Sequence, residues 1–219
     1  MPNNEVEDVM QNPYILVQNI LTSVDDGNTI MNGKTISDEN FTSIELYGSS
    51  VHKKKENDNN SSFHLENESG VGDITLYQVF PGIELVYNDM HMEYCNKKQV
   101  TASDVMEINY CKEGRSECLF GENQYCYMAS GDLSFCSLHC NKHQSQFPTS
   151  HYHGVTVVID FSRITDEMKN VLKLLSVNLE RIKEVACMQE FTVIRANQTI
   201  EHIFSELYTV PDHIRQGYI

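Results

Sequence analysis

The chain has 219 residues, of which 40% are apolar, and it carries a formal net charge of −15. A chain of this length can bury an ordinary core in one large or two small domains, so we expect a folded protein. Nucleic-acid affinity depends largely on basic residues that displace counterions. The balance of 16 Lys and Arg against 31 Asp and Glu therefore argues against DNA binding by this chain alone.

The sequence has no apolar run of about 18 residues, the length expected of a membrane-spanning helix. Its N-terminus, MPNNEVEDVM, is acidic where a secretory signal would be basic and then apolar. We therefore expect a cytoplasmic protein without a membrane partner. Seven cysteines, an odd number, then indicate reduced thiols rather than a disulfide framework. Oxidation of Cys111 and Cys118, which flank a single predicted turn, stays open.

The first 70 residues predict an acidic N-terminal arm. Pro13 to Val24 predicts a short helix, because the proline precedes apolar residues at helical spacing and Asp25-Asp26-Gly27 follows. Phe41 to Tyr47 is strand-like. His52 to Gly70, HKKKENDNNSSFHLENESG, is polar and rich in Asn and Ser, which predicts a flexible loop.

Residues 71–162 have the pattern of a β domain. ITLYQVF and IELVYND flank Pro81-Gly82, the expected turn. Between Glu107 and Leu138, short alternating segments are separated by Lys112-Glu113-Gly114 and two further turn-like triplets, and this spacing predicts a β-meander. Gly154 to Phe161, GVTVVIDF, is rich in β-branched residues and predicts a buried strand. Strands in this number can close a barrel or form a two-sheet jelly roll.

Residues 163–219 predict helices. Thr165-Asp166-Glu167 is the expected N-terminus of one helix, and Asn178 is the expected cap of a second. Gln198 to Tyr208 predicts another after a short strand at Phe191 to Ile194. The apolar stripes Met168–Leu175 and Ile200–Leu207 can serve as core or as a dimer surface. Pro211 would start a last helix, and because nothing caps it before Ile219, we expect a fragment of a longer protein.

Four segments together resemble the N-terminal sensing half of AraC-type (AraC/XylS) bacterial transcriptional regulators: EINYCKEGRSECLF, QYCYMASGDLSF, SHYHGVTVVIDF and TIEHIFSELYTVPDHIRQGYI. The resemblance covers roughly residues 71–219. It implies an α+β fold, in which a cupin-like β-barrel (jelly-roll) is followed by a helical dimerising segment. It also implies a small-molecule effector, a homodimer and DNA contact through a helix-turn-helix domain that this chain lacks.

Polar residues on the expected strands are the candidates for effector contacts: Glu107, Asn109, Arg115, Tyr127, His151 and His153. Alternate residues of a strand point to opposite faces, so Glu107 and Asn109 share a face, and the strand register decides whether that face lies inside. Inside, each would need a ligand or a neighbour as hydrogen-bond partner. A solvent-facing position of these strand residues stays open.

Two groups of residues have the chemistry of metal ligands. His91, Glu93, His151 and His153 would serve the alternative function, a metal-dependent cupin oxygenase or isomerase. Whether Cys136, His139, Cys140 and His143 bind zinc stays open, because structural zinc sites usually draw two ligands from a distant segment. The strand EINYCKEG has no histidine, and neither Gly-x-Ser-x-Gly nor a Gly-rich phosphate loop is present. We therefore expect a binding module without a metal, a cofactor or a catalytic site.

Overall fold

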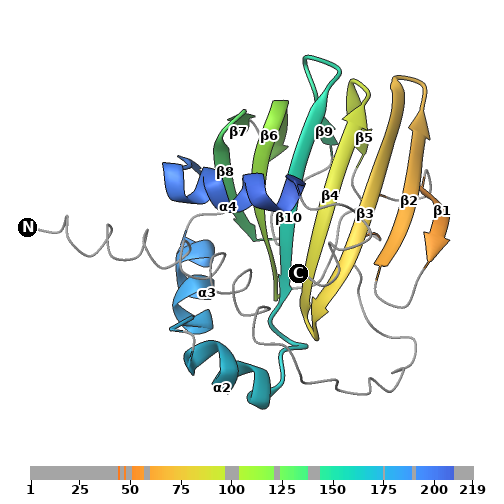
Figure 1. Cartoon of the computed structure of the whole chain (residues 1–219). Coiled ribbons are helices and arrows are strands. Elements are labelled where there is room, and N and C mark those ends of the chain that lie inside the picture. Colours follow the sequence, from red (N-terminus) through yellow and green to blue (C-terminus); the bar gives the residue numbers. More distant parts are fainter. Residues whose placement is uncertain are drawn as a thin grey trace, which may run out of the picture.

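The computed structural model describes residues 44, 47, 51–56, 60–96, 104–120, 124–137, 144–174, 176–188 and 191–209. In these ranges a mostly antiparallel sheet curls into a half-barrel, with helices packed against one of its faces (Figure 1). Closure into the jelly-roll barrel of the resemblance stays a prediction. Among the same residues no helix is both long and apolar enough to cross a membrane.

The described strands are β1 (Val51–Glu56), β2 (Asn60–Asn67), β3 (Gly70–Phe80), β4 (Ile83–His91), β5 (Tyr94–Asn96), β6 (Val105–Phe120), β7 (Gln124–Ala129), β8 (Asp132–Ser137), β9 (Gln144–Gln146), β10 (Tyr152–Asp160) and β11 (Phe191–Arg195). The described helices are α2 (Asp166–Leu174), α3 (Leu179–Met188) and α4 (Gln198–Thr209). Hydrogen-bonded neighbours follow the order β1-β2-β3-β4-β10-β6-β8-β11, while β7 and β9 also pair with β6, and β5 pairs with β9.

Strand β6 runs unbroken for 16 residues and pairs with two strands in turn. Its first half, Met106 to Tyr110, pairs with β8, and its second half, Arg115 to Phe120, pairs with β7. The predicted turn at Lys112-Glu113-Gly114, and with it the sequential meander, was therefore wrong.

Gly114 explains why this segment resembles a turn. It has a positive φ of 86°, but inside β6, next to a register shift opposite His153 and Gly154. A Cβ atom at Gly114 would lie 2.0 Å from the carbonyl oxygen of His151, so the close approach of the two backbones requires glycine here. Because the strand continues, Cys111 and Cys118 lie on the same strand and do not face one another across two strands.

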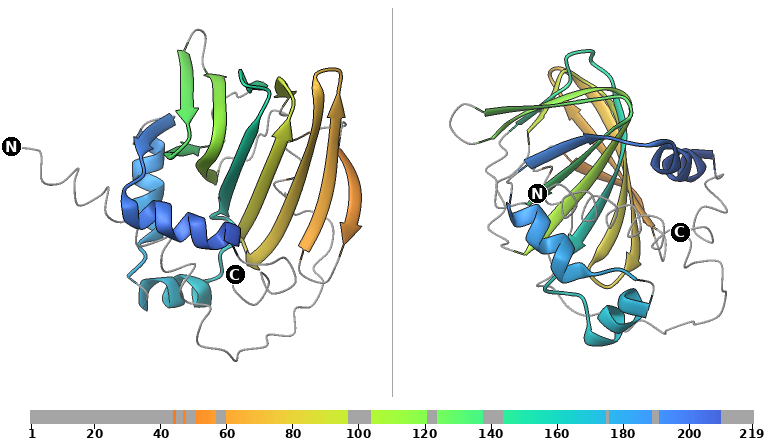
Figure 2. Two further views of the ribbon diagram at one scale, coloured as in Figure 1. Left: turned by 45° about the horizontal axis from the view of Figure 1, so that its top comes forward. Right: turned by 90° about the vertical axis from the view of Figure 1, so that its left-hand side faces the viewer.

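The sheet has two faces, each with its own apolar layer. The outer face carries the helices, and β4 and β10 contribute to it Leu85, Tyr87, Val155, Val157 and Ile159. The inner face looks toward β5 and β7, and the same two strands contribute to it Val86, Met90, Tyr152 and Val158. Because side chains alternate along a strand, these sets interleave residue by residue. Figure 2 shows the helices lying along one side of the curled sheet.

Helices α2 and α3 begin where the sequence predicts. Asn178 Oδ1 accepts a hydrogen bond from the Arg181 backbone N–H at 3.0 Å, and Thr165 Oγ1 accepts one from the Met168 N–H at 3.2 Å. The stripe Ile200–Leu207 of α4 packs against the outer face and is therefore core.

The prediction of a flexible loop at His52 to Gly70 was wrong, because this segment contains β2 and all but the first residue of β1. Strand β2 pairs with β3 and adds both strands to the edge of the sheet. Phe63 and Leu65 are buried against the inner layer, while the residues beside them are polar. Two apolar side chains one residue apart are thus enough to hold a strand whose composition is typical of a loop. The predictions for Pro13 to Val24 and for the helix after Pro211 lie outside the described residues.

The packing of α4 gives a direct test of the fold. Phe204 is fully buried and stacks on Tyr110, with ring centroids 4.3 Å apart. Phe204→Ala is expected to lower the free energy of unfolding by about 3–5 kcal/mol, because a large cavity replaces the ring. His202→Ala, on the exposed side of the same helix, should change it by less than about 0.5 kcal/mol. Urea denaturation followed by circular dichroism measures both, and equal effects of the two substitutions would contradict this packing.

Candidate functional site

A row of hydrogen-bonded polar side chains crosses the inner face of the sheet. Tyr47 donates its hydroxyl hydrogen to Asn88 Oδ1 at 2.7 Å, and Asn88 Nδ2 donates to Thr156 Oγ1 at 3.1 Å. Thr156 donates in turn to Asn109 Oδ1 at 2.7 Å, and Asn109 Nδ2 donates to Ser134 Oγ at 3.2 Å. The row links four neighbouring strands, because Asn88, Thr156, Asn109 and Ser134 belong to β4, β10, β6 and β8. We call these five residues the inner polar row.

The inner polar row borders a cavity of about 40 Å³. This volume admits no more than a few water molecules. Glu107, which is 1% exposed, also lines the cavity, as do the apolar side chains of Met90, Met128 and Phe191. Tyr152 lies in the same lining, where burial raises the pKa of its phenol well above the usual value. The cavity therefore offers hydroxyl and amide groups together with a carboxylate.

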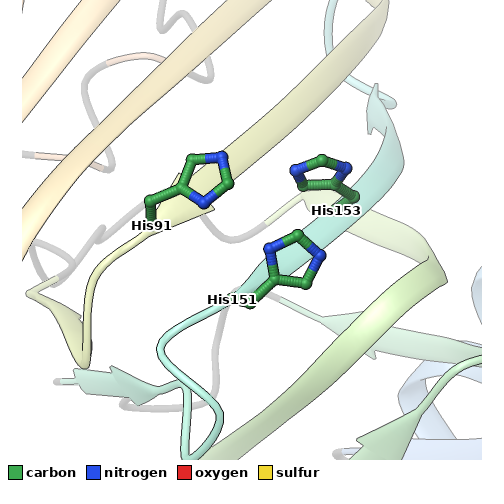
Figure 3. Close-up of side chains that lie close together, drawn as sticks. All are labelled: His91, His151 and His153. Atoms are coloured by element: carbon green, nitrogen blue, oxygen red, sulfur yellow. The ribbon is translucent and has the colours of Figure 1, made fainter.

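Three histidines form a second cluster near one end of the sheet (Figure 3). His91 ends β4, His153 lies on β10, and His151 precedes β10 by one residue. One ring nitrogen from each of the three lies within 4.8 Å of the other two. We call these residues the histidine cluster. Its chemistry is that of a ligand set for a divalent transition metal.

Two carboxylates flank the histidine cluster. Asp89 Oδ1 lies 2.9 Å from His91 Nε2 and 2.5 Å from His153 Nε2. Glu113 Oε2 lies 3.6 Å from His151 Nε2. The pairing register explains this proximity, since Asp89 and Glu113 lie opposite His153 on its two neighbouring strands.

Close backbone packing positions His91 and His151. A Cβ atom at Gly70 would lie 2.2 Å from the carbonyl oxygen of His91, which matches the approach of Gly114 to His151. Ser150 adopts a positive φ of 51°, which only a few per cent of non-glycine residues adopt, and so turns the chain toward β10. The Thr149 hydroxyl donates to the His151 carbonyl oxygen at 3.0 Å. These contacts hold the cluster on a defined backbone.

The six predicted contact residues fall in three places. Glu107 and Asn109 line the inner cavity, where hydrogen bonds to Thr156 and Ser134 provide Asn109 with neighbouring partners. His151 and His153 belong to the histidine cluster on the outer face. Arg115 and Tyr127 lie on the surface of β6 and β7, with the guanidinium carbon 5.2 Å from the centre of the tyrosine ring.

The structure locates only some of the residues that the sequence suggests as metal ligands. His91 joins His151 and His153, whereas Glu93 is not a member of the cluster. Of the Cys136 group, the described residues include only Cys136 itself, whose thiol is buried and donates a hydrogen bond to the Ser137 carbonyl oxygen at 3.2 Å. His139, Cys140 and His143 lie outside the described residues.

Sequence reasoning missed Tyr47, Asn88 and Asp89 as site residues. Asn88 and Asp89 are consecutive in β4 yet serve opposite faces of the sheet, Asn88 inside and Asp89 beside the histidines. An asparagine and an aspartate within the apolar segment IELVYND were the available signal, since polar residues in a buried strand need partners.

No family model matches the sequence, and no curated protein matches it. Solved structures do match. Apo ToxT from Vibrio cholerae is 9% identical, with 64% of this chain and 52% of ToxT covered at a TM-score of 0.42. The AraC-like transcriptional activator CuxR is 11% identical, with 63% of this chain and 64% of CuxR covered at a TM-score of 0.34. A cupin 2 conserved barrel domain protein from Rhodopseudomonas palustris is 20% identical, with 63% of this chain and 89% of that protein covered at a TM-score of 0.35. The chain thus spans about half of the length of ToxT and less than two thirds of CuxR.

The inner polar row predicts a cost for removing its central hydroxyl. Thr156→Val keeps the shape of the side chain but removes the acceptor of Asn88 Nδ2 and the donor to Asn109 Oδ1, while the bonds of Tyr47 to Asn88 and of Asn109 to Ser134 remain. The free energy of unfolding is expected to fall by about 1–3 kcal/mol. Thr75→Val, a half-buried threonine of β3 outside the row, is the matched control, with a change below about 0.5 kcal/mol. Chemical denaturation compares the two, and a fully stable Thr156→Val variant would contradict the importance of the row.

Cys111 is expected to be a poor nucleophile. Burial raises the pKa of its thiol to about 12, and Asp132 acts in the same direction. At pH 8 the folded chain should alkylate at Cys111 more than about tenfold slower than the urea-unfolded chain, because both thiolate fraction and access fall. Timed iodoacetamide labelling with peptide mass spectrometry measures this rate. Equal rates in the two states would rule out the burial of this thiol.

Proposed function

We propose that this chain is the effector-sensing and dimerisation domain of an AraC-type transcriptional regulator with a cupin-like barrel. In this proposal it is a cytoplasmic binding module and not an enzyme, and it reaches DNA through a helix-turn-helix domain outside this chain. The sequence resemblance over residues 71–219 supports the family. The inner cavity supports the binding role.

The position of Phe191 is the observation that carries the proposal. Its side chain lines the inner cavity, and it is the first residue of β11, the strand that lies between α3 and α4. Strand β11 pairs with β8 along its whole length, and at its other end Arg195 Nε also lies 3.2 Å from Asp132 Oδ1. A change in the cavity therefore acts on the segment that leads into α4.

The small volume of the cavity makes binding and movement inseparable. An effector larger than a few water molecules enters only if lining side chains move. Met90 and Met128 are flexible side chains that can repack, whereas Phe191 moves together with the start of its strand. An effector then prefers one arrangement of β11 and α4 over another, which is the physical requirement for a sensor.

The lining also limits the chemistry of the effector. Asn88, Asn109 and Thr156 offer donors and acceptors without charge, and Glu107 adds a carboxylate. A small neutral or cationic molecule with several hydroxyl, amide or amine groups fits this set, while an anion would be repelled by Glu107 and by the net charge of −15.

The dimer surface in this proposal lies on α2. The stripe of α4 is buried in the core, whereas Val171 and Leu174 of α2 are 46% and 85% exposed. Exposed apolar side chains on a helix next to buried Leu172 are available for a second copy of the chain.

A thermal-shift screen of the 219-residue chain tests the sensing role. The panel consists of monosaccharides, amino acids and polyamines, and at least one compound is expected to raise the Tm in a saturable, dose-dependent way. Asn109→Leu removes two hydrogen bonds of the cavity wall and should abolish the shift, whereas the exposed His202→Gln should retain it. A panel without any saturable shift, or a shift that Asn109→Leu leaves unchanged, would argue against an effector in this cavity.

A further inference from the structure

We propose that His91, His151 and His153 bind a divalent transition-metal ion on the outer face of the sheet, with Asp89 as an oxygen ligand. One ring nitrogen of each already lies within 4.8 Å of the other two. Figure 3 shows the three rings close together. Zinc bound by imidazole at about 2.0–2.1 Å in tetrahedral geometry holds its ligand nitrogens roughly 3.3 Å apart. The nitrogens must therefore come about 1.5 Å closer together than they are now. Rotation of the rings about χ2, whose energy wells are broad, can supply this movement.

The strand register keeps the ligands on one face. His153 and Asp89 are directly paired, and His91 and His151 lie two residues beyond them toward the same end of the sheet. Residues two apart in a strand point the same way, so the three imidazoles and the carboxylate project together. The inner cavity lies on the other face, because Asn88 and Thr156, which line it, alternate with the residues of this set.

Charge favours a cation at this position. The carboxylates of Asp89 and Glu113 lie beside three imidazoles that coordinate in their neutral form. Lys112 Nζ lies 3.7 Å from Glu113 Oε1 and offsets that charge, so Asp89 supplies the negative charge that attracts a divalent ion. Asp89 Oδ1 contacts both His91 Nε2 and His153 Nε2, so a single oxygen already sits between two ligand nitrogens.

The nitrogen of His153 has an unusual environment. Its Nε2 atom is shielded from solvent, and its short approach to Asp89 lacks the angle of a hydrogen bond. For a metal ion to bind both atoms, Asp89 Oδ1 must move away from His153 Nε2 until the two are roughly 3.3 Å apart, and the ion would then satisfy both atoms at once. Three nitrogens and one oxygen favour Zn²⁺, Co²⁺, Ni²⁺ or Cu²⁺ over Mg²⁺ and Ca²⁺, which prefer oxygen ligands.

Isothermal titration of the untagged 219-residue chain with ZnCl₂ tests the site. We expect one ion per chain, and no comparable binding of MgCl₂. His153→Gln should weaken Zn²⁺ binding by more than about 100-fold, and Asp89→Asn by about 10- to 100-fold. His202→Gln is the matched control, because His202 also lies beside a carboxylate, 3.2 Å from Glu206, but outside the cluster. The His202→Gln variant should bind Zn²⁺ with the same affinity as the unmodified chain.

Spectroscopy separates this site from the Cys136–His143 segment. Co²⁺ bound by nitrogen and oxygen lacks the intense near-ultraviolet absorption bands that thiolate ligands produce. In addition, the Cys140→Ser variant should bind the metal ion as the unmodified chain does. Electron paramagnetic resonance of the Cu²⁺-loaded chain should show splitting from several nitrogens, a readout that needs no variant to fold. Three results would each overturn the proposal. The first is that the chain binds no ion stoichiometrically, and the second is that Co²⁺ gives thiolate bands that disappear in Cys140→Ser. The third is that a folded His153→Gln variant binds Zn²⁺ with unchanged affinity.

Discussion

The pairing of β10 between β4 and β6 is the constraint on which the rest of the structure depends. Both ladders are antiparallel and nearly continuous, so the register of β10 decides which side of the sheet each side chain of three strands occupies. Thr156 then lies opposite Asn109 on the inside, while Val155 and Val157 join the layer under the helices. A slip of one residue would move His153 to the inner face and would place Thr156, away from Asn88 and Asn109, in the apolar layer under the helices. The apolar layer therefore stabilises the register and, through it, both polar clusters.

Much of the sheet can be predicted from local pattern. Strands β4 and β10 are long and strongly apolar, and Gly82 between β3 and β4 has the positive φ that a tight turn requires. The failures have a common cause, because composition does not distinguish a turn from a bulge or a loop from an edge strand. Gly114 serves a bulge with the same φ that a turn would need, and β2 is held by Phe63 and Leu65 within polar sequence.

The candidate sites were predictable to a smaller extent. Glu107 and Asn109 could be assigned to one face of a strand from alternation alone, but whether that face is the inner one depends on pairing with β10. His91 lies 60 residues before His151 in the chain, and only the ladder between β4 and β10 brings them together. Tyr47 reaches the inner polar row across 41 residues of sequence through a hydrogen bond to Asn88. Contacts of this range arise from topology, which local periodicity does not encode.

The two polar clusters are connected to the helices by different routes. The inner cavity contacts β11 through Phe191, whereas residues next to the histidine cluster contact Tyr208 near the end of α4. There Tyr87, two residues before Asp89, packs edge-on against Tyr208, with ring centroids 5.7 Å apart. Lys112 Nζ, next to Glu113, lies 4.1 Å from the centre of the same ring. Helix α4 thus lies between a strand that borders the cavity and residues that border the histidines. If the two proposed sites are occupied, each ligand would act on the same helix, and the two ligands would not need to touch to influence one another.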